Sequence, residues 1–384
     1  MQNCRVLNCI TGLSIGGAEH MLARFAHSLT NTRFEARVLS LMSPGPVGKI
    51  LEGHGVQVDT LRMKATRPSV MAFGRLRPAV RGSGCDIVHG WMYHGNMAAS
   101  IGARFDRRQP VVWSIHHSVD NVLDEKPLTR LVIRALACMS SSTAAISYCS
   151  RISADQHESL GFDPERRVII PNGVDCDEFR PRAEARARLT AAFGIPAGRM
   201  IIGNVARGHP MKHHEGFVRT LARLHQDGYD VHGLIIGDGH QEGAARLMAR
   251  ALGIDDRLST PGPRADIAEL LPGLDVFLLS SAWGEAFPLS VAETMASGVP
   301  VVVTDVGDCA WLVGCSDLVA KPKDSDGQAA IIRRVLDLSA ADRKALGMAG
   351  RTRVTENFSI KQYTERHVQL YETALAHSQR RRSA

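Results

Sequence analysis

Short apolar runs alternate with longer segments of helix length along this chain, and the alternation falls into two series. In the first series, buried strands are expected at 4–10, 35–42, 85–91, 110–116 and 142–147. The segment 18–29, which follows the first run, has the apolar period of a helix. The second series begins near residue 200, with strands expected at 200–206, 231–237, 257–262, 275–281 and 299–305.

Alternating strands and helices predict parallel sheets covered on both faces, which is an α/β fold. Two series predict two doubly wound, Rossmann-like domains at 1–178 and 179–357, followed by a C-terminal helix with a basic tail at 358–384. We expect that helix to pack back on the N-terminal domain. Ligands of such sheets bind outside the carboxyl ends of the strands, so two facing domains would form a cleft between two such ends.

Composition narrows the class of protein. The chain has 384 residues, 44% of them hydrophobic and 22% charged, which is ordinary for a globular protein. A net charge of +7 fits an anionic ligand, nucleic acid or an anionic membrane surface. No apolar run approaches the roughly 18 residues of a membrane span, and the N-terminal run is too short for a signal peptide. We therefore expect a cytoplasmic protein with buried thiols rather than a disulfide framework.

The segment "WGEAFPLSVAETMASGVP", residues 283–300, carries two glutamates separated by seven residues, Glu285 and Glu293. Its start follows an expected strand, Pro288 suits the first position of a helix, and Gly298 suits the helix end. A helix N-terminus suits phosphate, and a carboxylate there suits sugar hydroxyls. The alternative is that Glu285 is an ordinary first-turn charge and Glu293 lies on a solvated face.

Two further groups follow strand ends. Arg207 and Lys212 follow the run at 200–206 and suit a diphosphate, although they are equally explained as surface cations. Gly16 and Gly17 follow the first run and allow a close backbone approach to a ligand, or form a plain tight turn.

A third glycine group offers a different function. Gly237, Gly239 and Gly243 follow a strand and open a helix, as in a dinucleotide-binding loop. This loop follows the second strand of its domain rather than the first, which disfavours the fingerprint. A dinucleotide-dependent oxidoreductase is nevertheless the alternative function.

Two histidines lie at a strand end, since His116 ends the run at 110–116 and His117 follows it. A histidine in such a place can position a reacting group, or it is simply a satisfied polar residue. The doubled histidine leaves open which of the two faces a ligand. No set of ligands with metal-site spacing is present, so no metal and no cofactor are expected.

Together these residues resemble the retaining GT-B glycosyltransferases of the group-one, glycogen-synthase-like superfamily, most of all the bacterial exopolysaccharide and lipopolysaccharide transferases. The family signature of two glutamates separated by seven residues matches "EAFPLSVAE", and the order of the motifs is kept over nearly the whole chain. The other matching motifs are "GGAE" at 16–19, "PNGVD" at 171–175, the pair Arg207 and Lys212, and "GDG" at 237–239.

The resemblance implies a retaining transfer of a sugar from a nucleoside-diphosphate sugar, with UDP as the expected nucleotide, to a glycan or lipid-linked acceptor in bacterial surface polysaccharide synthesis. It implies that Glu293 holds the ribose and that Glu285 and His116 lie beside the donor sugar. The diphosphate would be held by Arg207 and Lys212, by the backbone N–H groups of Ala286, Phe287 and Leu289, and by Gly16, Gly17 and Gly237. The base would lie near Gly262 and Arg264.

The physics of the reaction agrees with this assignment. Breaking a sugar–phosphate bond builds negative charge on the leaving diphosphate, which fixed cations and N–H groups stabilise without a metal. Departures from the family pattern are His213 after Lys212, and Trp311 where many relatives carry an acid. A catalytically idle nucleotide-sugar binder is disfavoured by the intact residues, and a glycosidase by the ribose role of Glu293.

The acceptor side is less defined. The segment 63–84 interleaves cations with apolar residues, and it is either a solvated helix or a peripheral contact with an anionic membrane. Its cations are Lys64, Arg67, Arg75, Arg77 and Arg81, and its apolar residues include Val70, Met71 and Phe73. Nucleic acid is not expected as a partner, because no recognition module is evident and only 5% of residues are aromatic.

Overall fold

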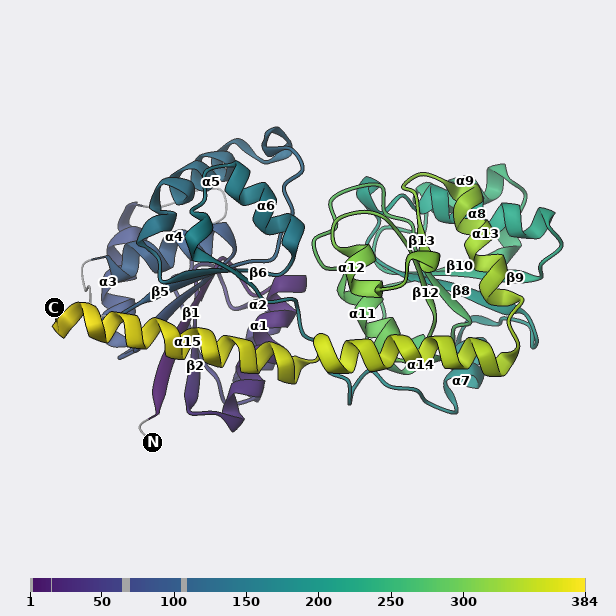
Figure 1. The fold of residues 1–384 in the computed structure, drawn as a ribbon. Helices are drawn as coiled ribbons and strands as arrows, with labels where there is room; N and C mark the ends of the chain where they lie inside the picture. The colour runs from purple at the N-terminus through teal and green to yellow at the C-terminus, as the bar shows by residue number, and fades with distance from the viewer. Residues whose placement is uncertain (1–2, 15, 64–69, 105–108, 384) are drawn as a thin grey trace. The chain divides into compact units, whose positions relative to one another are not determined.

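The fold is described from a computed structural model of the chain. The structure describes all residues except 1–2, 15, 64–69, 105–108 and 384. The side chains of 70–73 and 381–383 are not described either. The chain divides into two compact units, one of residues 1–173 with 360–384 and one of residues 174–359 (Figure 1). We call them unit 1 and unit 2.

Unit 1 is built on a seven-stranded parallel sheet in the order β3-β2-β1-β4-β5-β6-β7. Its strands are β1 (Cys4–Ile10), β2 (Phe34–Ser40), β3 (Gln57–Thr60), β4 (Ile87–Trp91), β5 (Val111–Ile115), β6 (Ala145–Tyr148) and β7 (Arg167–Ile169). Its helices are α1 (Gly17–Ser28), α2 (Gly45–Gly53), α3 (Val70–Gly82), α4 (Met92–Ala103), α5 (Pro127–Met139), α6 (Arg151–Ser159) and α15 (Ile360–Ser383). Single turns of 3-10 helix are η1 (Leu29–Asn31), η2 (Val122–Asp124), η3 (Ser140–Ser142) and η4 (Pro164–Arg166).

The helices of unit 1 cover both faces of this sheet (Figure 1). One face packs against α1, α2 and α15, and the other packs against α3, α4 and α5. The central strands are therefore buried on both sides, which explains their continuous apolar runs.

The last helix, α15, completes the core of unit 1. Tyr363 and Tyr371 of α15 pack on Phe25 of α1, with ring centres 5.3 Å and 6.3 Å apart. The hydroxyl of Tyr371 lies 2.7 Å from Nδ1 of His89, whose Nε2 lies 2.6 Å from Oγ of Ser114. This buried chain of hydrogen bonds ties the C-terminal helix to β4 and β5.

Unit 2 is built on a six-stranded parallel sheet in the order β10-β9-β8-β11-β12-β13. Its strands are β8 (Met200–Val205), β9 (Val231–Ile236), β10 (Leu258–Gly262), β11 (Val276–Leu279), β12 (Val301–Thr304) and β13 (Val319–Ala320). Its helices are α7 (Ala185–Phe193), α8 (His214–Gln226), α9 (Ala244–Ala251), α10 (Ile267–Leu270), α11 (Leu289–Ala296), α12 (Cys309–Val313), α13 (Ser325–Leu336) and α14 (Ala340–Asn357). Single turns of 3-10 helix are η5 (Pro210–Lys212), η6 (Asp255–Arg257), η7 (Leu271–Gly273) and η8 (Ser316–Leu318).

Both sheets reverse their strand order once. The reversal lies between β1 and β4 in unit 1 and between β8 and β11 in unit 2. In a doubly wound sheet, the loops at the carboxyl ends of the two strands beside this reversal diverge and leave room for a ligand. The loops after β1, β4, β8 and β11 are therefore the first places to seek a site.

The predicted α/β fold with two parallel, Rossmann-like sheets is confirmed. The units divide at 173/174 and 359/360, where the sequence predicted 178/179 and 357/358. Three short strands, β3, β7 and β13, were not predicted. Of the basic segment 63–84, Lys64 and Arg67 lie outside the described residues, as do the side chains of Val70, Met71 and Phe73, while Arg75, Arg77 and Arg81 lie on α3.

Candidate active site

The loops after β8 and β11 are bonded to each other at the carboxyl edge of the unit 2 sheet. The backbone N–H of Ala282 donates to the carbonyl of Met211 at 2.8 Å. The hydroxyl of Ser280 donates to the carbonyl of Lys212 at 3.0 Å. These bonds fix the two loops across the point where the strand order reverses.

Lys212 and Glu285, one from each loop, form an ion pair there. Nζ of Lys212 lies 2.5 Å from Oε1 of Glu285, and their side chains are 15% and 5% exposed. The hydroxyl of Ser281 donates to the same carboxylate oxygen at 2.5 Å. A lysine in this pairing keeps two of its three N–H donors for other acceptors. The ammonium is thus held in a fixed position at the site's edge.

Gly307, in the turn after β12, allows the loop that carries Glu285 to pack closely against this turn. Its φ is +57°, and an added Cβ would lie 1.7 Å from the carbonyl oxygen of Glu285. Only glycine combines this backbone conformation with that contact. The neighbouring Cys309 is buried, and burial together with the Glu285 carboxylate raises the pKa of its thiol well above the ordinary value. This thiol therefore stays protonated at neutral pH.

Arg207 lies on the loop after β8 and is exposed. It makes no ion pair with another described residue. Its loop rests on the loop after β9, where the backbone N–H of Gly208 donates to the carbonyl of Asp238 at 2.6 Å. Gly237 allows this contact, because its φ is +150° and an added Cβ would lie 2.0 Å from the carbonyl oxygen of Ala206. The "GDG" segment thus supports the loop that carries Arg207.

Helix α11 begins beside Glu285, with Pro288 at its N-cap. A proline side chain cannot cap a helix, so the first N–H groups of α11 are not satisfied by their own N-cap residue. Phe287 points inward and packs on Phe358, with ring centres 5.4 Å apart, which holds the backbone of 286–289 in place. Glu293 lies in the second turn of this helix and is half-buried.

The residues predicted near the base lie at the end of β10. Gly262 is buried with a φ of +88°. Arg264 is exposed, and its guanidinium donates two hydrogen bonds to the carboxylate of Asp266, at 2.8 and 2.7 Å. This bidentate pair occupies the side chain of Arg264, which leaves mainly the backbone of this turn to bind a ligand.

In unit 1, Gly16 and Gly17 begin helix α1 immediately after β1 and its turn. Gly16 is the N-cap, and its extended backbone brings Glu19 so close that an added Cβ would lie 2.3 Å from Oε2 of Glu19. Burial raises the pKa of the Glu19 carboxyl above its ordinary value. The glycine pair therefore lies at the helix start next to the strand reversal of unit 1.

The structure separates the two histidines that follow β5. The ring of His116 stacks on the indole of Trp91 at 5.0 Å with planes 3° apart, and its Nδ1 lies 2.8 Å from Oδ1 of Asn172. Nε2 of His116 is buried without a partner among the described residues, and burial lowers the pKa of His116 to about 4. Because the amide oxygen only accepts, Nδ1 carries the proton, and neutral His116 presents Nε2 as an acceptor.

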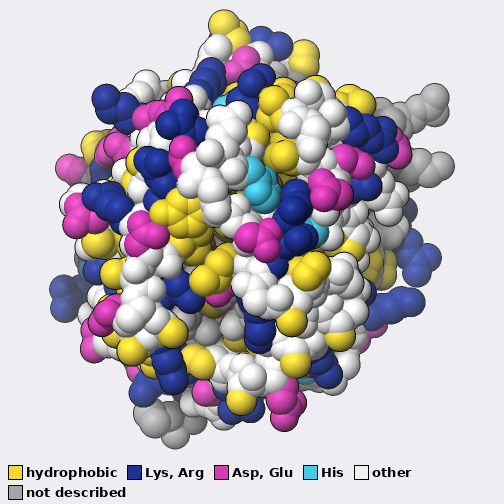
Figure 2. Space-filling view, turned by 90° about the vertical axis from the view of Figure 1, so that its right-hand side faces the viewer, with side chains coloured by type: hydrophobic (Ala, Val, Ile, Leu, Met, Phe, Trp, Pro, Cys, Tyr) yellow, Lys and Arg dark blue, Asp and Glu magenta, His cyan; other side chains and the backbone are white. Residues whose placement is uncertain are grey.

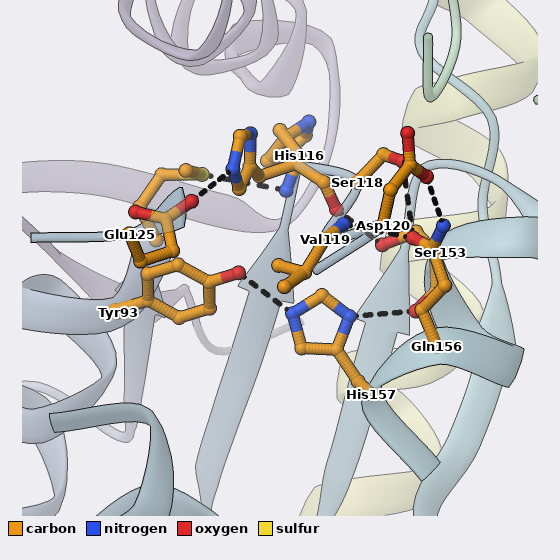
Figure 3. Close-up of polar contacts among 11 residues, drawn as sticks. Tyr93, His116, Ser118, Val119, Asp120, Glu125, Ser153, Gln156 and His157 are labelled. Carbon is orange, nitrogen blue, oxygen red and sulfur yellow. Dashed lines mark hydrogen bonds and ion pairs between the residues drawn. The ribbon is translucent and has the colours of Figure 1, made fainter. Parts of the chain in front are cut away.

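His117 has a different role. Its Nε2 lies 2.8 Å from Oε1 of Glu125, and the two form a partly exposed ion pair when His117 is protonated. In Figure 3, His116 lies above the contacts by which His157 joins the hydroxyl of Tyr93 to the backbone carbonyl of Ser153. Of the two histidines, only His116 thus has a buried nitrogen without a partner among the described residues.

The predicted site residues fall into two groups by unit. Lys212, Glu285 and the start of α11 are brought together at one edge of the unit 2 sheet, with Arg207 and Gly237 on the adjoining loops. His116, Gly16 and Gly17 follow strands of unit 1. Among the described residues, no cluster of histidine, cysteine or acidic side chains is arranged to hold a metal ion.

Two family models match the chain, one to each unit. The model of group 1 glycosyl transferases matches residues 186–353, and the model of glycosyltransferase family 4 matches residues 15–178. The chain is a group 1 glycosyltransferase. The predicted resemblance to the group-one glycosyltransferases is therefore confirmed, and the enzyme is the predicted transferase rather than the alternative oxidoreductase.

Relatives and solved structures of this glycosyltransferase agree with the assignment. A protein of Bacillus subtilis (strain 168) named glycosyltransferase EpsF is 24% identical over 310 residues, 78% of this chain and 79% of EpsF. The UDP-Gal:alpha-D-GlcNAc-diphosphoundecaprenol alpha-1,3-galactosyltransferase of Escherichia coli is 26% identical over 227 residues, 58% of each chain. The structure of Anabaena Alr3699/HepE in complex with UDP superposes with a TM-score of 0.83 at 20% identity, over 96% of this chain and 100% of HepE.

Three residues that contact the candidate site residues were not predicted. Ser281 and Trp91 carried no motif, and Asn172 was assigned only to a turn. For Asn172 a signal existed, since an asparagine in a buried turn of "PNGVD" has a side chain that must bond to something. The contact of Trp91 with His116 joins the ends of the neighbouring strands β4 and β5, which local patterns do not reveal. The bond of Ser281 to Glu285 lies within one loop, and no motif marks that serine.

Proposed function

We propose that this glycosyltransferase moves a sugar, with retention of anomeric configuration, from a UDP-linked donor to a glycan or lipid-linked acceptor in bacterial surface polysaccharide synthesis. The observation that carries the proposal is the ion pair of Lys212 and Glu285 beside the start of α11. A diphosphate is the ligand that best fits a fixed ammonium next to free helix N–H groups.

The leaving diphosphate would be stabilised from two sides. Lys212 would donate its remaining N–H groups to the phosphate oxygens, and exposed Arg207 would close on them from the loop after β8. The backbone N–H groups of Ala286, Phe287 and Leu289 would add the positive end of α11. Since these groups are already in place before bond breaking, they stabilise the developing charge without reorganisation.

The first role of Glu285 would be to position the ammonium of Lys212. Its Oε1 is shared by the ammonium and the Ser281 hydroxyl, so the carboxylate fixes where the cation lies. Its second oxygen would then be the one that accepts from a donor-sugar hydroxyl. Glu293, one turn into α11, would accept from the ribose hydroxyls, and the turn at Gly262 and Arg264 would hold the base.

The unit 1 residues would act on the sugar and the phosphates. His116 would accept a hydrogen bond at Nε2 from a sugar hydroxyl, because its proton is held at Nδ1 by Asn172. Gly16 and Gly17 would place the N–H groups at the start of α1 against phosphate. The UDP bound in the HepE structure and the UDP-linked, lipid-linked substrates in the name of the E. coli relative support this choice of donor and acceptor.

A donor panel tests the proposal. Hydrolysis or transfer is measured with UDP-, GDP- and ADP-sugars, with and without a chelator, and the anomeric configuration of the product is determined by NMR. We expect UDP-sugars to be preferred, the chelator to have no effect, and the product to keep the donor's configuration. Preference for another nucleotide would overturn UDP as the donor nucleotide, loss of activity with the chelator would overturn metal independence, and inversion would overturn retention.

We further propose that the protein works in the cytoplasm at the inner face of the membrane, to which a membrane-bound acceptor would bring it.

A further inference from the structure

An apolar surface lies on unit 1 between 123 and 134. Leu123 on η2 is 63% exposed, and Leu128 and Leu131 on α5 are 50% and 62% exposed. They are three of the nine large hydrophobic side chains that are exposed among the described residues, yet they fall within nine positions of the chain. We call Leu123, Leu128 and Leu131, with the cations Lys126, Arg130 and Arg134, the α5 surface.

The leucines of α5 are exposed because this helix carries apolar side chains on two sides. Ile133 and Leu136 face inward and pack with Trp113 and its neighbours on the sheet. Leu128 and Leu131 are three residues apart, with Arg134 three residues further on, so they share the outward face. A helix that is apolar on both sides is stable in water only at a cost, which indicates that the outer side has an occupant.

The cations of the α5 surface are available to an outside partner. Lys126 and Arg134 are exposed, and Arg130 is half-buried with no partner for its Nε. None of the three forms an ion pair within the described part of the chain. The acids nearby are Asp124, which is exposed, and Glu125, which is bonded to His117.

Helix α9 of unit 2 provides a comparison. Leu247 on α9 is 58% exposed and also lies between arginines. Those arginines are neutralised, because Arg246 pairs with Asp255 at 3.1 Å and Arg250 pairs with Glu242 at 3.4 Å. In the face drawn in Figure 2, basic and acidic side chains likewise lie close to one another. The α5 surface differs in combining exposed leucines with cations that have no ion-pair partner.

We infer that the α5 surface docks on an anionic lipid bilayer, with the leucines in the boundary between headgroups and acyl chains and Lys126 and Arg134 on the headgroups. Aliphatic side chains flanked by unpaired cations are the pattern of interfacial helices. A protein partner fits less well, since its hot spots favour Trp and Tyr and a stable interface needs roughly 1,000 Å² or more. A bilayer surface requires neither aromatic hot spots nor an interface of that area.

The α5 surface is rigidly joined to the strand end that carries His116. Between them, the hydroxyl of Ser118 and the backbone N–H of Val119 donate to Oε1 of Gln156 at 3.0 and 2.8 Å (Figure 3). The hydroxyl of Ser153 donates to the carbonyl of His117 at 2.6 Å. Docking would therefore hold the carboxyl end of β5 at a fixed height above the bilayer. The benefit for a lipid-linked acceptor rests on the proposed function, whereas the docking itself does not.

Flotation of the full chain with vesicles tests the inference, without donor or acceptor. We expect binding to vesicles of phosphatidylcholine with phosphatidylglycerol at low salt, little binding to phosphatidylcholine alone, and release by salt. Leu128→Ser with Leu131→Ser, and Lys126→Glu with Arg134→Glu, should each weaken binding about tenfold or more. The matched controls on α9, Leu247→Ser and Arg250→Glu, should bind as the unchanged protein does.

A fluorescent reporter locates the contact independently. Leu128→Trp should shift its emission to the blue when anionic vesicles are added, and Leu247→Trp should not shift. Absence of vesicle binding, equal losses for the α5 and α9 variants, or no shift at position 128 would each overturn the inference. If sedimentation instead shows a dimer that Leu128→Ser with Leu131→Ser dissociates, the occupant is a second copy of the chain and the bilayer is excluded. Thermal unfolding of every variant checks that it is folded.

Discussion

Nζ of Lys212 and Oε1 of Glu285 lie 2.5 Å apart although 73 residues separate them in the chain. Both side chains are largely buried, so each is the main counter-charge of the other. Removing one partner of a buried pair leaves an uncompensated charge and costs about 3–5 kcal/mol. Under the proposed function, we therefore expect substitutions at this pair to change both catalysis and stability.

Lys212→Met should lower kcat/KM by about 100-fold or more, because one fixed donor to the leaving diphosphate is lost. It should also lower the free energy of unfolding of unit 2. Adding Glu285→Gln to Lys212→Met should restore much of the stability and none of the activity. Turnover and urea unfolding are measured on the same samples, and a double variant as unstable as the single one would contradict the pairing.

Asn172 should set the pH dependence of the reaction through His116. With Asn172→Leu, Nδ1 loses its acceptor, and kcat/KM should fall by roughly tenfold, the value of one hydrogen bond. Asn172→Asp keeps an acceptor at Nδ1 but adds a negative charge, which raises the pKa of His116. Since protonation removes the acceptor at Nε2, the acid limb of the pH–rate profile should move to higher pH in Asn172→Asp. An unmoved limb in that variant would count against a role for His116.

Glu293 should contribute to nucleotide affinity rather than to turnover. Glu293→Gln should raise the Kd for UDP by roughly 10- to 100-fold, because a charged acceptor for the ribose hydroxyls is weakened. Glu356→Gln on α14 is the matched control, since that carboxylate is exposed. Calorimetric titration with UDP measures both, and equal affinities for the two variants would refute the ribose contact.

Gly307 should be irreplaceable because of where its Cβ would lie. Gly307→Ala should displace the Glu285 loop and lower kcat/KM sharply, with some loss of stability. Gly253→Ala is the control: Gly253 has a similar φ of +69°, but an added Cβ would meet no atom within 4 Å. That control should cost about 1 kcal/mol of stability and no activity. If both variants behave alike, the effect is only backbone strain.

The stability of unit 1 should fall as the pH drops below about 6.5. Burial lowers the pKa of His116 and His157 to about 4 and that of His367 to about 3. Between these values and about 6.5 the unfolded chain binds more protons, so the free energy of unfolding decreases by up to about 1.4 kcal/mol per pH unit for each histidine. Above about pH 6.5 this contribution is complete.

Hydrogen exchange of unit 1 peptides at several pH values checks this dependence. His367→Phe should flatten it, because one titrating group is replaced by a ring that fits among Phe25 and Tyr363. His377→Phe on the same helix is exposed and should leave the dependence unchanged. A slope that survives His367→Phe in full would mean that other groups cause it.

Much of this fold was predictable because its central strands are buried on both sides and are mostly apolar, as in "VHGLII" of β9. The strands that were missed lie at sheet edges. β3 has the sequence "QVDT", with every residue partly or fully exposed, and β13 has only two residues. Edge strands need little apolar surface, so periodicity does not mark them.

Candidate residues that lie together at the edge of the unit 2 sheet were named from the sequence, whereas their contacts with each other were not predicted. Lys212 and Glu285 were each assigned a ligand contact, and their bond to each other depends on β8 and β11 being neighbours in the sheet. Asn172 was placed in a turn, and its bond to His116 spans 56 residues. Such pairings follow from strand order, which local sequence patterns do not contain.

The chain leaves unit 1 after residue 173 and returns to it only at residue 360. Tyr363 and Tyr371, which close the core around Phe25, are thus synthesised only after all of unit 2. Unit 2 is continuous and has all of its residues earlier. During translation, residues 1–173 must therefore wait for α15 while unit 2 is made. A ribosome that stops before residue 360 releases a protein in which only α1 and α2 cover one face of the unit 1 sheet.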